Sequence, residues 1–103
     1  MKFPMRVFGE IKGLDQDKIR LFQEKDISPF ELRGNFLEIE YEGPFIDIEQ
    51  ILNDIARHLD QGVQGHVDCI DHENWEVFRY TINKGILSCK KINPDNALEA
   101  YKW

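Results

Sequence analysis

The densest group of reactive side chains lies between residues 66 and 72, where two histidines, two aspartates and one cysteine are interspersed with apolar residues. Imidazoles and carboxylates are common zinc ligands, and a cysteine near a histidine is a common nucleophilic pair. The segment is also typical of a β-strand, in which neighbouring side chains point to opposite faces. His66 and Asp68 would then share one face, and Cys69 would lie on the other, away from His66.

A metal site in this segment needs a further ligand beyond His66 and Asp68. His72 in the following turn is one source and Glu76 is another, whereas a closed zinc site usually has four ligands. One hypothesis is therefore a small metal-dependent or acid–base enzyme centred on His66, Asp68 and His72. The competing interpretation is an exposed polar face with solvated histidines. No cofactor is indicated, because the sequence contains no glycine-rich phosphate loop and no paired-cysteine metal motif.

The two cysteines are interpreted as buried free thiols. The charges of Asp68 and Asp71 would raise the pKa of Cys69 and disfavour a reactive thiolate. Cys69 and Cys89 are placed on the two strands that flank a third, so their Cα atoms would be roughly 9–10 Å apart. A disulfide needs a separation below roughly 7 Å, so both thiols are expected to be reduced.

Charge is distributed unevenly along the chain. The formal net charge is −6, but residues 34–78 hold eleven Asp/Glu and one Lys/Arg, whereas residues 1–33 sum to +1 and residues 79–103 to +3. Such an acidic block disfavours direct binding of nucleic acid and favours a partner with a basic surface.

A stripe of three glutamates is the clearest acidic feature inside this block. Glu38, Glu40 and Glu42 alternate with apolar residues, so they would stand on one face of one strand. The leading hypothesis is a small non-enzymatic interaction or inhibitor-type protein that binds a basic protein partner through these glutamates, together with Asp68 and Trp75. The competing interpretation is a solvated face balanced by bases from other strands.

Aromatic residues are concentrated in the second half of the chain. Phe78 and Tyr80 would share one face of a strand, and Trp75 would lie on the other with a second apolar residue. Because tryptophan and tyrosine are frequent interface anchors, a homo-dimer through Trp75 and the terminal Tyr101 and Trp103 is a further hypothesis, compatible with partner binding.

The element expected to position these groups is an amphipathic helix over residues 47–60. Its apolar residues recur at helical spacing, Asp47 is a good N-cap, Gln50 completes a capping-box pattern, and Gly62 can supply a left-handed stop. Ile51 and Ile55 are expected to be fully buried.

The remaining segments predict strands at residues 3–11, 35–42, 65–71, 75–82 and 85–92, of which the last three form a meander. Residues 14–26 favour a helix capped by Asp15, with a strand over 18–24 as the alternative. Residues 28–35 are interpreted as a connection, and a short helix is expected after Asn93.

The fold class that follows is α+β, with a mostly antiparallel sheet of about five strands and one main helix packed on one face. The 103 residues are expected to form one domain, residues 1–103. No secretory signal or membrane span is recognisable in the sequence, so the expectation is a cytoplasmic protein that does not enter a membrane.

Overall fold

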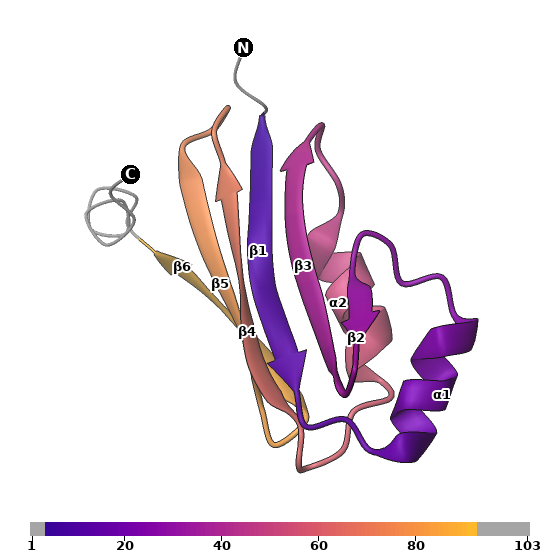
Figure 1. Cartoon of the computed structure of the whole chain (residues 1–103). Coiled ribbons are helices and arrows are strands. Elements are labelled where there is room, and N and C mark those ends of the chain that lie inside the picture. The colour runs from indigo at the N-terminus through magenta and orange to yellow at the C-terminus, as the bar shows by residue number, and fades with distance from the viewer. Residues whose placement is uncertain (1–3, 93–103) are drawn as a thin grey trace.

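The computed structural model describes residues 4–92. In chain order the elements are β1 (Met5–Lys12), α1 (Gln16–Glu24), β2 (Glu31–Arg33), β3 (Phe36–Gly43), α2 (Ile48–Ala56), β4 (Gln64–Asp71), β5 (Glu76–Asn83) and β6 (Ile86–Ile92). The strands form one antiparallel sheet in the order β2-β3-β1-β4-β5-β6 (Figure 1). The predicted α+β class and the β4–β5–β6 meander are therefore confirmed. The helix expected after Asn93 lies outside the described residues.

The sheet has six strands instead of about five because the segment before Gly34 also pairs. β2 forms a short hairpin with the start of β3, in which Leu32 lies opposite Leu37. Gly34 makes the tight turn with a positive φ of 61°, a conformation that glycine adopts without steric cost. A three-residue strand has too little alternation to be distinguished from a connection by its pattern.

β1 occupies the middle of the sheet and pairs on both sides. Its residues pair with β3 along one edge and with β4 along the other. Val7 and Ile11 are completely buried, as expected for alternate residues that face the core. The first strand of the chain thus determines where the ends of β3 and β4 lie.

The apolar core lies on one face of the sheet, called the inner face here. Its most buried members come from several strands and both helices: Val7, Ile11, Phe22, Leu37, Ile39, Leu52, Val67 and Ile82. α2 lies behind β3 and β2 in Figure 1, and α1 lies near the β2 edge. No helix of residues 4–92 covers the opposite, outer face.

α2 begins where the sequence predicts and ends one turn earlier. The Asp47 carboxylate accepts a hydrogen bond from the Gln50 backbone N–H at 3.1 Å, which confirms the N-cap. After Ala56 the backbone tightens, because the N–H of His58 bonds the carbonyl of Ile55 three residues before it. The helix therefore stops without a left-handed glycine, and the predicted role of Gly62 is wrong.

The buried stripe of α2 consists of Ile48, Leu52 and Ile55. Ile55 is 3% exposed, as predicted, whereas Ile51 is only half-buried at the border of the core. α1 is a helix and not the alternative strand. Its N-cap Asp15 accepts a hydrogen bond from the Lys18 N–H at 2.9 Å.

The two described helices have nine residues each. Neither is long and apolar enough to cross a membrane.

Shortening the Ile55 side chain tests the packing of α2 on the sheet. Ile55→Ala removes a buried side chain and leaves a cavity, so the free energy of unfolding should fall by about 2–5 kcal/mol. Ile86→Ala is the matched control, because Ile86 is 70% exposed and its loss should change stability by about 0.5 kcal/mol at most. Urea titration of both variants measures the difference. Equal losses would show that α2 is not packed as described.

Candidate functional site

The acidic block keeps part of its negative charge unpaired after folding. Within residues 4–92, six of its eleven carboxylates form ion pairs: Glu38, Glu42, Asp54, Asp60, Asp68 and Glu76. The other five have no ion-pair partner among the described residues: Glu40, Asp47, Glu49, Asp71 and Glu73. Where these five lie decides where the protein presents a negative surface.

Four of the five lie at one end of the sheet. Met5 at the start of β1 is opposite the last residue of β3 and the last residue of β4. Asp47 and Glu49 follow β3, whereas Asp71 ends β4 and Glu73 lies in the next turn. The register of β1 therefore brings together acidic residues more than twenty positions apart. These four carboxylates are called the acidic end.

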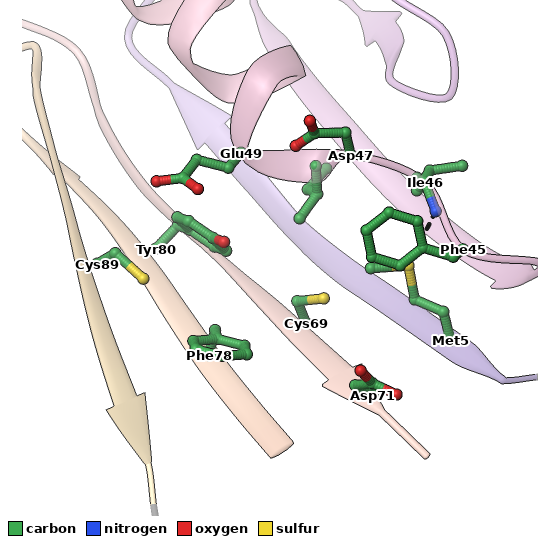
Figure 2. Close-up of a pocket in the computed structure, with 11 residues that line it drawn as sticks. Met5, Phe45, Ile46, Asp47, Glu49, Cys69, Asp71, Phe78, Tyr80 and Cys89 are labelled. Atoms are coloured by element: carbon green, nitrogen blue, oxygen red, sulfur yellow. Dashed lines mark hydrogen bonds between the residues drawn. The ribbon is translucent and has the colours of Figure 1, made fainter. Parts of the chain in front are cut away.

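A hollow of about 320 Å³ opens on the inner face at the acidic end. Its apolar lining is formed by Met5, Phe45, Ile46, Ile48, Phe78 and Tyr80, and both cysteines also border it. Figure 2 shows Asp47 and Glu49 on the α2 side and Asp71 on the β4 side. No lysine or arginine of residues 4–92 lines the hollow. The arrangement combines apolar walls with a carboxylate rim.

Hydrogen bonds hold parts of this rim in place. Asp71 accepts from the backbone N–H groups of Glu73 and Asn74 and from the Asn74 side chain, at 2.9–3.1 Å. Partial burial raises the pKa of Asp71, but these hydrogen bonds outweigh that effect and the net shift is downward. Asp71 is therefore ionised at neutral pH. The Ile46 N–H donates to the Met5 sulfur at 3.3 Å and fixes the chain that enters α2 (Figure 2).

The floor of the hollow contains side chains that resist ionisation. Burial raises the pKa of Tyr80, and the nearby Cys89, Cys69 and Glu49 raise it further. Burial likewise raises the pKa of Cys69 to about 12, with smaller contributions from Asp71 and Cys89. Neither group is poised as a nucleophile or base at neutral pH.

Both cysteines are free, as predicted, and they lie on the strands that flank β5. Cys69 is buried, but Cys89 is exposed, so the expectation of two buried thiols is wrong for Cys89. The reason is that β6 is an outer strand of the sheet, and most of its residues are solvent-exposed.

The glutamate stripe stands on the outer face of β3, opposite the buried Leu37 and Ile39. Glu38 is paired with Arg33 at 2.9 Å, and Glu42 lies 3.6 Å from Arg6. Glu40 is exposed and has no ion pair within residues 4–92. Bases from β2 and β1 thus neutralise two thirds of the stripe.

Asp68 is buried, at 1% exposure, although its strand position predicted an exposed polar face. Its two carboxylate oxygens accept from Nε and Nη2 of Arg79 at 2.8 and 3.2 Å, directly across the β4–β5 pair. This bidentate pair occupies the carboxylate and shields it from solvent. Asp68 is therefore a structural partner of Arg79 and is not presented for a protein contact.

The structure separates the side chains of the proposed metal site. His66 is exposed beside a hollow bordered by Glu10 and Lys12, and His72 lies in the β4–β5 turn, with its ring 6.3 Å from that of Trp75. Among the described residues, no group of three or more histidine, cysteine or acidic side chains is close enough to hold a metal ion. His66, Asp68 and His72 do not converge on one point.

Two large aromatic side chains are exposed at the same end as the acidic residues. Phe45, on the connection from β3 to α2, is 73% exposed, and Trp75, at the end of the β4–β5 turn, is 47% exposed. Trp75 has a φ of 54°, a left-handed conformation that is rare for a bulky residue. It therefore lies in the turn and not in β5, where it was predicted. Tyr101 and Trp103 are outside the described residues.

The acidic end was not recognised in the sequence as a site. The charge count marked residues 34–78 as acidic, but nothing local indicates that Asp47 and Asp71 lie at one hollow. Comparison with known proteins adds no assignment, because no family model, no curated protein and no solved structure matches the chain.

The two thiols should react at very different rates. In the folded protein at pH 8, Cys89 should react at once with Ellman's reagent, whereas Cys69, whose pKa is about 12, should react only on unfolding. Unfolded, never-reduced protein should release two equivalents. Cys89→Ser should abolish the fast phase alone. Two fast thiols in the parent would contradict the burial of Cys69.

The backbone of Trp75 provides a second test. Glycine tolerates the left-handed conformation and alanine does not, so Trp75→Gly should be more stable than Trp75→Ala by about 1 kcal/mol. Both variants lose the same ring contact with His72, so their difference isolates the backbone. Thermal unfolding measures it. An alanine variant as stable as the glycine variant would contradict the left-handed turn.

Proposed function

We propose that the protein is a small non-enzymatic binding protein of the inhibitor type, which uses the acidic surface of residues 34–78 to occupy a basic surface of a protein partner. The observation that carries this proposal is the acidic end, where Asp47, Glu49 and Asp71, which have no ion-pair partner within residues 4–92, border a largely apolar hollow. The cytoplasm remains the proposed location.

The electrostatic argument favours association with a cationic surface. Like charges held at one end of a folded domain create a local negative potential, which accelerates encounter with a basic partner and repels nucleic acid. Phe45 and Trp75 add exposed aromatic area at the same end, which is the side-chain type enriched at interface centres. Charge would then steer the partner, and the aromatic groups would hold it.

Catalysis has less support from the geometry. The nearest candidates for a nucleophile or base at the hollow, Cys69 and Tyr80, have raised pKa values. His66 is paired in register with Glu10 and Thr81 and lies away from the hollow. The alternative hypothesis, an acid–base or metal-dependent enzyme centred on His66, Asp68 and His72, would depend on His66 for activity, but the three side chains form no metal-binding cluster among the described residues.

Neutralising the acidic end tests the proposal. Glu49→Gln with Glu73→Gln removes two charges and no described hydrogen bond or ion pair of either side chain, so stability should change by at most about 0.5 kcal/mol. A basic partner purified by capture on the parent protein should then associate about tenfold more slowly at low salt, with little change in dissociation. Added salt should shrink the difference.

The matched control removes two charges from the outer face. Glu38→Gln with Glu40→Gln changes the net charge equally, but at the glutamate stripe. Surface plasmon resonance compares both double variants with the parent. Unchanged association of the Glu49/Glu73 variant would contradict a role for the acidic end, and a loss confined to the Glu38/Glu40 variant would place the contact on the β3 stripe.

A further inference from the structure

The hollow has the size and lining of a pocket that could receive one side chain of a binding partner. Its volume of about 320 Å³ is near the lower limit of small-molecule pockets, which span about 300–1,000 Å³. Met5, Ile48 and Phe78 provide apolar walls, and Phe45 stands at the rim with most of its surface in solvent. Such a space accommodates one long side chain and not an extended cofactor.

The charges around the hollow select a cation. Asp47, Glu49 and Asp71 border it, and no basic residue of the described chain does. The only described lysine on the inner face of the adjoining β6, Lys91, is paired with Glu76 at 2.8 Å. The N-terminus of α2 contributes about half a positive charge, which is small against three carboxylates and is already capped by Asp47.

Other occupants fit these charges poorly. An anion would meet three carboxylates, and a neutral apolar segment would cover them without compensation, which is unfavourable. A metal ion needs converging ligands, and no cluster of three is present among the described residues. A long cationic side chain suits both the apolar walls and the carboxylate rim. Its aliphatic stem packs on the apolar atoms while its charge stays at the rim.

Resting on the function proposed above, we infer that the hollow is where the basic partner inserts one arginine-type side chain. The stem lies against Met5, Ile48 and Phe78, the guanidinium faces Glu49 and Asp71, and the exposed ring of Phe45 offers it a stacking surface. The hollow thereby provides one defined anchor within a broader electrostatic contact.

Small probes of matched shape test this inference. n-Butylguanidinium reproduces the arginine side chain, and n-butylurea has nearly the same shape without the charge. With methyl-labelled methionine, the Met5 signal reports on the hollow, because Met5 lines it and the chain has only one other methionine. n-Butylguanidinium should shift this signal saturably, with half-saturation at roughly millimolar concentration, as expected for so few atoms. n-Butylurea should bind at least about fivefold more weakly.

Two single variants locate the charge that matters. Glu49→Gln should raise the half-saturating concentration of n-butylguanidinium about fivefold. Glu40→Gln, the same change on the outer face, should leave it within about twofold. Glu40 lies outside the hollow, so salt screens the interaction between its charge and a cation bound there. Equal binding of the urea, no saturable shift, or equal effects of the two variants would overturn the inference. A Met5 shift produced by raising the protein concentration alone would identify a second copy as the occupant and also overturn it.

The outcome separates this inference from the function on which it rests. If the probe fails but Glu49→Gln with Glu73→Gln still slows the partner, the acidic end binds without inserting a side chain into the hollow. If the probe binds and the partner is unaffected by that double variant, the proposed function fails while the hollow remains a cation site.

Discussion

The two-sided pairing of β1 is the constraint on which the rest of the structure depends. β3 and β4 are twenty residues apart in the chain. Both pair with β1, and this shared pairing places the last residue of each strand opposite Met5. At Gly9 and Gly65 the backbones of β1 and β4 approach so closely that a Cβ atom would collide with the facing strand. That register places the start of α2 and the end of β4 at one hollow. The hollow and its carboxylates exist because of this arrangement.

Folding also decides which acidic residues keep their charge exposed. The bases of β1, β2, β5 and β6 lie opposite or beside acidic residues of neighbouring strands, as Arg79 does for Asp68 and Arg33 for Glu38. Most of these are surface pairs that contribute little to stability, but they neutralise the sheet faces. No lysine or arginine of the described chain lines the hollow at the acidic end, so the carboxylates that border it are not neutralised there.

Local signals in the sequence predicted most elements, but they could not predict which residues far apart in the chain lie together. Asp15 and Asp47 marked two helix starts, and the alternation around Val7 and Leu37 predicted strands and their buried faces, because capping and burial depend on near neighbours. The sequence could not show that β1 lies between β3 and β4, so it could not place Asp47 beside Asp71. Asp68 was misjudged for the same reason, since its burial depends on a partner in another strand.

The two outermost described strands limit how far the sheet can grow. β2 has three residues, too few to accept a long added strand. β6 is longer, but a second copy pairing along it would bring two Lys90 and two Lys91 side chains onto one seam, and like charges across a strand pair repel. Lysines on an edge strand and a short edge strand are both known protections against edge-to-edge aggregation. β6 thus carries two adjacent lysines along the edge where a further strand would pair, and one of them, Lys91, also pairs with Glu76 of β5.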